Sequence, residues 1–455
     1  MTARRRLVAV GAVALAARLV LALVIHPPFS FVKSDAAGYI FRAQDLLAGD
    51  FSADPAVTFF PYGTHFPVSY THLRAHFLLA AVLGAFGGAE WSVGLVWALF
   101  GTAAVVFSLL SAEELIGDRP RAVLVVGLVL ALYPPWVAHT GFALSETPTT
   151  CAIAAAAWFG LRLAKRGRWH DALGVGVAIA LGTTLRPQLL VSVVFLAIAF
   201  LWRRRELKGL SWKSAVAVAL PIALVLGFSA ERIRYHTGER GLVSTNGAFN
   251  LALGRCHAHT LIAARSDNST FRPPSFLRLW RFREQSGVDP IPALDPAITP
   301  ELSFDGKLWE QAPARALAKR CVAETGPWRQ VKYSLSHVFL LWAYNVPWPT
   351  KGPIAMATSI AHPIVLVPGL VLALLASLRR RHALALTLSA HIFALFAVAA
   401  IFFGEARLRM PYDGIIVLLA VWAYGDLWQE VKARGERVRA PQARDLYDAS
   451  SLTRR

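Results

Sequence analysis

Charged residues are scarce in this chain, and their scarcity excludes most soluble proteins. Only 16% of the 455 residues are charged, whereas an average soluble protein carries about 25%. Apolar residues make up 55% of the chain, and several apolar runs reach the length of about 20 residues that a helix needs to cross a bilayer. We therefore expect an all-α polytopic membrane protein.

Three further absences narrow the kind of membrane protein that the sequence can encode. The chain has three cysteines, and their spacing is not that of metal ligands. No small-residue cleavage site follows the first apolar run, residues 7–25, which favours an uncleaved first span over a signal peptide. No internal repeat or low-complexity segment is evident, which disfavours a transporter built from inverted repeats.

Acidic residues are outnumbered by basic ones, 28 to 47, which gives a net charge of +19. The basic residues form tracts between apolar runs, so they indicate membrane topology before nucleic-acid binding. The tracts are residues 4–6, 119–121, 165–168, 203–205, 379–381 and the tail after 432. All of them can be cytoplasmic only if 75–88 and 335–348 do not cross the bilayer.

This topology gives about ten transmembrane helices with both termini inside. The expected spans are 7–25, 91–110, 121–138, 146–164, two short arms within 172–202, 214–230, 353–378, 383–403 and 412–428. The domains follow from it: an N-terminal catalytic module 1–230 with a first outer loop 26–90, a lid loop 231–351, C-terminal helices 352–428 and a cytoplasmic basic tail 429–455. Both outer loops are expected on the extracytoplasmic side of the plasma (inner) membrane, the first carrying juxtamembrane helices and the second forming a small lid.

The stretch that begins at Asp35 follows the first span by about ten residues. Apolar residues recur at helical spacing from Tyr39 to Leu47, and Gly49 stands past the end. This pattern predicts an amphipathic helix along the membrane surface, with Ser34 as its N-cap. Asp35 then either complements the helix N-terminus or takes part in chemistry.

Several polar groups converge on the outer face under this topology. Arginine suits phosphate because its fork donates two parallel hydrogen bonds, and a nearby carboxylate can deprotonate an attacking group. The candidate catalytic residues are Asp35 and Glu146, and the candidate substrate- or phosphate-binding residues are Tyr39, Arg74, Arg186, Asn246, Arg407 and Arg409.

These stretches resemble the GT-C superfamily of integral-membrane glycosyltransferases, in particular the protein O-mannosyltransferase and aminoarabinose-transferase-like group. The matching segments are 35–49, 66–87, 132–148, 182–187 (Gly-Thr-Thr-Leu-Arg-Pro), 244–251 and 404–411 (Gly-Glu-Ala-Arg-Leu-Arg-Met-Pro). Ala36 stands where the family commonly has a second acidic residue, and Glu146 where it often has aspartate.

The resemblance implies transfer of a sugar from a polyprenyl-phosphate donor to a lipid, glycan or protein acceptor on the extracytoplasmic face. Asp35 would be the general base, and direct displacement of the phosphate would invert the anomeric centre. Whether a divalent metal ion takes part is left open by the sequence. No nucleic acid is expected as a partner. The alternative is a lipid or glycolipid transporter or flippase, which would also need polar groups at a central cavity.

Alternatives also stay open for single residues. Glu146 could open the next span as an N-terminal acid, and Arg186 could snorkel to the interface. Arg407 and Arg409 could be interface anchors. Cys256 and Cys321 both fall in the predicted lid, where an oxidising location would permit either a disulfide or two unpaired thiols.

Overall fold

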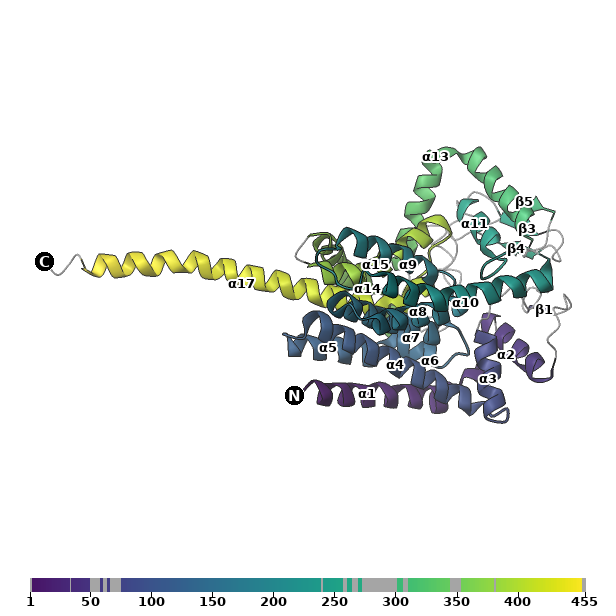
Figure 1. Cartoon of the computed structure of the whole chain (residues 1–455), viewed down its shortest axis with the longest axis horizontal. Helices are drawn as coiled ribbons and strands as arrows, with labels where there is room; N and C mark the ends of the chain where they lie inside the picture. The colour runs from purple at the N-terminus through teal and green to yellow at the C-terminus, as the bar shows by residue number, and fades with distance from the viewer. Residues whose placement is uncertain are drawn as a thin grey trace.

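The structure, a computed structural model, is built almost wholly from helices (Figure 1). It describes residues 2–32, 34–49, 58–59, 64–65, 75–238, 240–256, 260–263, 269–271, 301–305, 310–343, 353–379 and 382–451. The prediction of an all-α polytopic membrane protein is confirmed.

Each segment expected to span the membrane is helical. The helices are α1 (Ala3–Leu19) continued by η1 (Val20–Ile25), α4 (Trp91–Ile116), α5 (Pro120–Ala131) with α6 (Pro134–Thr140), α7 (Glu146–Arg166), α8 (Trp169–Leu185), α9 (Leu189–Trp202), α10 (Trp212–Thr237), α14 (Pro353–Ser377), α15 (Ala383–Ile401) and α17 (Asp413–Ser451). Within the described part of the chain, five helices are long and apolar enough to cross a bilayer alone, or six if α5 and α6, bent by 41°, count as one span. The short arms α8 and α9 flank Arg186 and Pro187, as the sequence predicts.

A buried arginine stabilises the bend between α5 and α6. Pro134 cannot continue the preceding helix, so the last carbonyls of α5 lose their intrahelical partners. The Arg18 guanidinium, fully buried, donates to the Ala131 carbonyl at 2.9 Å and to the Leu130 carbonyl at 3.4 Å.

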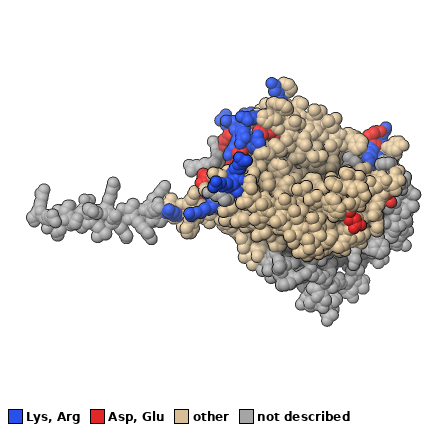
Figure 2. Space-filling view, turned by 90° about the horizontal axis from the view of Figure 1, so that it is seen from below, with Lys and Arg blue, Asp and Glu red and all other residues tan. Residues whose placement is uncertain are grey.

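Basic tracts gather at one end of the bundle. Ion pairs there join Arg6 to Glu113 at 2.6 Å and Arg166 to Glu114 at 2.5 Å. Figure 2 shows the concentration of Lys and Arg where α17 leaves the bundle, and Figure 1 places the N-terminus at the same end. Helices α2 and α3 and the small sheet lie at the opposite end (Figure 1).

Helix α2 (Ser34–Leu47) carries the stretch that begins at Asp35, and it ends before Gly49, whose φ is +83°. Its apolar face packs on α3 (Ala75–Ala85) in a small core with residues of α4. Two residues in the C-terminal half of α2 depart from a simple amphipathic pattern: Arg42 is buried, whereas Leu47 is 46% exposed. Helix α3 has 11 residues, about 16 Å, which is too short to cross a bilayer.

The segment between α10 and α14 has its own small core. Helix α11 (Gly247–Arg255) packs on α13 (Gln311–Ala343), and a disulfide joins Cys256 to Cys321. Beside them β3 (Thr260–Ala263) pairs antiparallel with β4 (Ser269–Phe271) and parallel with β5 (Glu301–Phe304). A second pair, β1 (Thr58–Phe59) and β2 (Thr64–His65), lies between α2 and α3. Of the two alternatives for the cysteines, the structure has the disulfide.

Candidate active site

The candidate site is built around the turn that joins α15 to α17. An extended stretch leads into α16 (Ala406–Arg409), and a 3₁₀ turn, η7 (Met410–Tyr412), follows with Pro411 near its start. Gly404 fixes the path of this turn, because a Cβ there would lie 1.7 Å from the His337 carbonyl oxygen. Residues two apart on a helix face opposite sides, so Arg407 and Arg409 point in different directions.

Arg407 connects the two carboxylates that the sequence predicts to be catalytic. Its Nη1 lies 2.7 Å from Asp35 Oδ2, and its Nε donates to Glu146 Oε1. Asp35 comes from α2 and Glu146 from the first turn of α7, so three segments far apart in the sequence meet at one guanidinium. The site is therefore assembled only in the folded chain.

A second arginine completes the cluster. Arg186, at the break between α8 and α9, donates from Nη2 to Glu146 Oε1 at 2.5 Å. The side chain of Glu146 is fully buried, whereas that of Asp35 retains 30% exposure and those of Arg407 and Arg186 retain 18% and 11%. Solvent reaches Asp35 and both arginines, while Glu146 lies behind them.

Glu405 is a third carboxyl group at this site, and the sequence alone assigned it no role. Glu405 is exposed as a residue, but partial desolvation of its carboxyl group raises its pKa. The charges of Asp35 and Glu146 raise it further, while those of Arg407 and Arg186 lower it. The sequence offers one indication of a role for Glu405. It stands two residues before Arg407, within the segment 404–411 that carries the family resemblance.

Arg409 does not join this cluster. It is fully buried, with Nε 2.9 Å from Asp413 Oδ1 and the guanidinium 5.1 Å above the Trp342 ring. Its Nη1 also donates to the Leu341 carbonyl at 3.0 Å. Asp413 in turn accepts from the Tyr133 hydroxyl at 2.9 Å, which extends the buried network to the bend between α5 and α6.

The remaining predicted residues lie around the cluster or outside the described residues. Tyr39 is buried on α2 and stacks on His76 at 6.4 Å. Asn246 precedes α11 and accepts from the Ser244 hydroxyl at 2.6 Å, a local contact within its own turn. Arg74 lies outside the residues that the structure describes.

The carboxylates at the site do not fit a divalent metal ion. Asp35 and Glu146 both bind Arg407, so a cation between them would have to displace a guanidinium that already neutralises them. No group of three or more His, Cys, Asp or Glu among the described residues is arranged to hold a metal ion.

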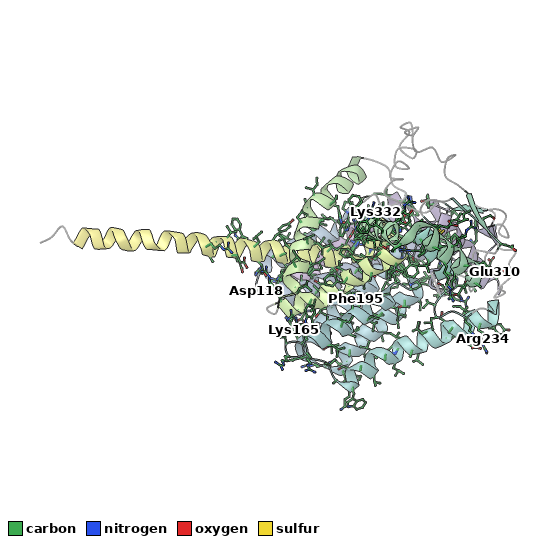
Figure 3. The ribbon with its side chains drawn as sticks, turned by 90° about the horizontal axis from the view of Figure 1, so that it is seen from above. Asp118, Lys165, Phe195, Arg234, Glu310 and Lys332 are labelled. Carbon is green, nitrogen blue, oxygen red and sulfur yellow. A yellow bond between two sulfur atoms is a disulfide. The ribbon has the colours of Figure 1, made fainter. Side chains whose placement is uncertain are left out.

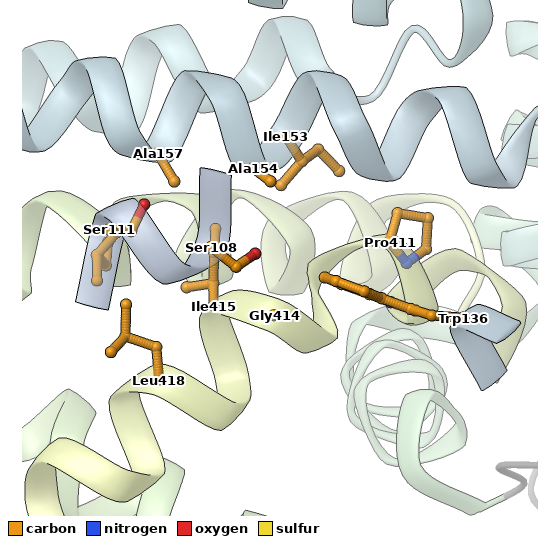
Figure 4. Close-up of a pocket in the computed structure, with 11 residues that line it drawn as sticks. Ser108, Ser111, Trp136, Ile153, Ala154, Ala157, Pro411, Gly414, Ile415 and Leu418 are labelled. Atoms are coloured by element: carbon orange, nitrogen blue, oxygen red, sulfur yellow. The ribbon is translucent and has the colours of Figure 1, made fainter. Parts of the chain in front are cut away.

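A separate cavity in the bundle is apolar and far less suited to a sugar phosphate (Figure 4). It lies between Trp136, Ile153 and Ile415, and two serines reach it. Both serine hydroxyls already donate to carbonyls of their own helix, Ser108 to Ala104 and Ser111 to Phe107. No charged residue lines it.

The small disulfide-bonded unit contacts the backbone that leads into the site. Arg255 donates to the Ile401 carbonyl at 2.8 Å, at the C-terminus of α15. The Gly404 amide donates to His337 Nδ1 at 3.2 Å, and burial lowers the pKa of His337 to about 4, so the ring is neutral near pH 7. These contacts hold the residues immediately before Glu405.

Comparison with known proteins agrees with this architecture. The oligosaccharyltransferase of Archaeoglobus fulgidus in its apo form is similar, with a TM-score of 0.50 and 12% identity over 95% of this chain and 52% of that one. The chain has a GT-C fold. It spans about half the length of that oligosaccharyltransferase.

Two further similarities were found, one to a family profile and one to a second solved structure. The sequence profile of the family described as dolichyl-phosphate-mannose-protein mannosyltransferase matches residues 73–228, which include Glu146 and Arg186. ArnT from Cupriavidus metallidurans, bound to undecaprenyl phosphate, has a TM-score of 0.37 and 16% identity over 92% of this chain and 77% of that one, a likeness too weak to argue from. None of the curated proteins compared with the chain matches it. The resemblance to the GT-C superfamily drawn from the sequence motifs is confirmed.

Proposed function

We propose that the chain is a membrane glycosyltransferase that moves a sugar from a polyprenyl-phosphate donor to an extracytoplasmic acceptor, with inversion. The observation that carries the proposal is the bridge from Asp35 through Arg407 to Glu146, with Arg186 bound to the same glutamate. One solvent-accessible carboxylate thus stands beside two arginines, as a base beside a phosphate site requires.

In this proposal Arg407 and Arg186 hold the phosphate of the donor. Each presents a fork of N–H donors, and negative charge builds up on the phosphate as the bond to the sugar breaks. Glu146 is the positioning residue for both arginines: it is fully buried, so it does not touch the substrate, and it fixes the two guanidinium groups relative to each other.

Asp35 is the proposed general base. Before the donor binds, its carboxylate is paired with Arg407 Nη1. A phosphate that competes for Arg407 frees Asp35 to accept the proton of the attacking hydroxyl or amine. The acceptor then forms a bond to the anomeric carbon, the bond from that carbon to the phosphate oxygen breaks, and the polyprenyl phosphate leaves as an anion. The sugar is transferred with inversion because one displacement occurs.

The topology supports an active site on the extracytoplasmic side of the inner membrane. The basic tracts lie at one end of the bundle, and α2, which carries Asp35, lies at the other (Figure 1). Lys and Arg favour the cytoplasmic side, so the end with α2 would face outwards. The segment 231–351 would be the lid over this face.

Transfer assays with the purified full chain in nanodiscs test the proposal. Polyprenyl-phosphate sugars are supplied as donors, acceptors are drawn from extracts of the cell envelope, and the anomeric configuration of the product is determined by NMR. We expect transfer with inversion. Movement of labelled lipid across the bilayer without any transfer would instead identify a flippase, and retention of configuration would exclude direct displacement.

A further inference from the structure

One face of α13 binds the segment that carries Arg407 at successive points. Ser334, His337 and Leu341 are spaced by three and four residues, so they lie on the same side of the helix. Their hydrogen bonds to this segment join the Ser334 hydroxyl to the Ala400 carbonyl at 2.8 Å, the Gly404 amide to His337 Nδ1 at 3.2 Å and Arg409 Nη1 to the Leu341 carbonyl at 3.0 Å. Arg407 stands between the last two contacts, so α13 holds the chain on both sides of it.

His337 binds a second segment as well. Its side chain is fully buried, and Nε2 lies 3.3 Å from the Gly254 carbonyl in the last turn of α11. The Gly404 amide can only donate and the Gly254 carbonyl can only accept, so Nδ1 carries the lone pair and Nε2 carries the proton. The neutral ring thus bridges α11 to the residues immediately before Glu405.

Two glycines leave this turn no room to shift. A Cβ at Gly404 would overlap the His337 carbonyl, and a Cβ at Gly254 would overlap the Phe402 carbonyl. The disulfide joins α11 to α13 behind these contacts. Because closely packed segments transmit displacements, a change at the His337 ring reaches the Gly404 amide, three residues before Arg407.

We propose that His337 is a positioning residue for the donor site: through the Gly404 amide it sets the rotation of α16 and with it the direction of Arg407. Residues two apart on a helix point to nearly opposite sides. A rotation of α16 would therefore take Arg407 away from the carboxylates that it binds. The proposal rests on the proposed function in one respect, because the donor phosphate is taken to bind Arg407.

Two substitutions each remove one of the two hydrogen bonds of the His337 ring. In His337→Asn the side-chain oxygen takes the place of Nδ1 and can accept from the Gly404 amide, whereas the bond to Gly254 is lost. In His337→Gln the amide nitrogen takes the place of Nε2 and can donate to Gly254, whereas the acceptor for Gly404 is lost. Each variant loses one bond, so both should be destabilised to a similar degree, and each is the control for the other.

Hydrogen exchange of the full chain in nanodiscs tests the placement of α16 without any activity. The Leu408 amide donates to the Glu405 carbonyl at 2.9 Å, and it should exchange about tenfold faster in His337→Gln than in the wild type or in His337→Asn. Lys332→Gln is a further control on the same half of α13, at an exposed residue labelled in Figure 3. The proposal is overturned if His337→Asn and His337→Gln exchange alike at Leu408, or if Lys332→Gln loses as much protection.

Transfer kinetics connect this turn to the donor. The donor KM should rise about tenfold in His337→Gln and stay near the wild-type value in His337→Asn, while the acceptor KM changes much less. Thermal unfolding is measured on the same preparations. A donor KM that is unchanged in His337→Gln, or that follows the melting temperature across the variants, overturns the proposal. If the wild type transfers no sugar, the proposed function fails, and hydrogen exchange at Leu408 still decides whether His337 positions α16.

Discussion

Arg407 Nη1 lies 2.7 Å from Asp35 Oδ2, although the two residues are separated by most of the chain. The same guanidinium donates to Glu146 through Nε, so it binds a different carboxylate through each of two nitrogens. This geometry requires the planar fork of arginine, because a lysine offers one point charge that cannot bind both partners in this way.

Arg407→Lys should therefore raise the donor KM at least tenfold and lower kcat, since both the phosphate contact and the placement of Asp35 suffer. Transfer rates at varied donor and acceptor concentrations measure this. The acceptor KM should change much less, because only the donor carries the phosphate at this site. An equal rise in the KM of the donor and of the acceptor would contradict a contact between Arg407 and the donor phosphate.

Glu146→Gln should impair transfer without creating a cavity. It conserves shape but removes the negative charge to which Arg186 and Arg407 are bound, in a position that is fully buried. Arg186 then has no carboxylate and Arg407 keeps only Asp35, which should lower the melting temperature and raise the donor KM, since truncating one partner of a buried charge pair costs about 3–5 kcal/mol. Glu231→Gln, at an exposed ion pair, is the control and should behave as the wild type.

Arg409→Met should affect stability far more than donor binding. Arg409 is buried with Asp413 and contacts no member of the Arg407 cluster that the structure describes. Leaving Asp413 without its partner should cost about 3–5 kcal/mol of stability. Thermal unfolding and donor KM are measured on the same preparations. A large rise in donor KM with an unchanged melting temperature would instead indicate that Arg409 contacts the donor phosphate.

Arg407 and Arg409 show which part of the site could not be predicted from the sequence. The segment 404–411 could be recognised from its motif, and the structure places Asp35, Glu146 and Arg186 beside it. Which of Arg407 and Arg409 faces the carboxylates depends on how α16 is rotated, and that is set by the packing of Gly404 on His337 and of Arg409 on Trp342. Contacts between distant segments of this kind leave no periodicity in the sequence.

The positions of the helices were easier to predict from the sequence than the contacts at the site. Hydropathy and basic tracts located the spans because the bilayer imposes both length and composition. The orientation of α2 was only partly predicted. Tyr39 is buried as expected, but Arg42 is buried as well, and the packing of α2 on distant segments such as α3 cannot be read from the local pattern.

Donor binding should weaken as pH rises if Glu405 lies beside the donor phosphate. Its pKa is raised above the ordinary value of about 4.3, so the carboxyl group stays protonated to a higher pH and becomes negative only as the pH passes that raised value. The donor KM should rise over this window in the wild type and stay low in Glu405→Gln. The same shift makes the folded chain bind more protons than the unfolded one, so stability should fall over the same window. If the donor KM of Glu405→Gln depends on pH as that of the wild type does, Glu405 is excluded as the group that titrates.

The disulfide should stabilise the unit that contacts the site. Replacing Cys256 and Cys321 with alanine opens a loop with a sequence separation of 65 residues, which costs about 4 kcal/mol in the chain-entropy model. Hydrogen exchange should increase in α11 and α13, while α4 and α7 keep their protection. Thiol counting on the denatured wild type without reductant should find Cys151 alone. Three free thiols would contradict the bridge.

The central claim is that Asp35 accepts the proton of the attacking group, and Asp35→Asn tests it most directly. Asparagine keeps the shape of the side chain at a solvent-accessible position, so the chain should fold and insert. With Asp118→Asn as a control at an exposed aspartate, single-turnover transfer from a polyprenyl-phosphate sugar is measured for both variants. The account predicts a drop of about 10²–10⁴-fold for Asp35→Asn, no change for Asp118→Asn and donor binding that is retained. Undiminished transfer by Asp35→Asn would contradict it.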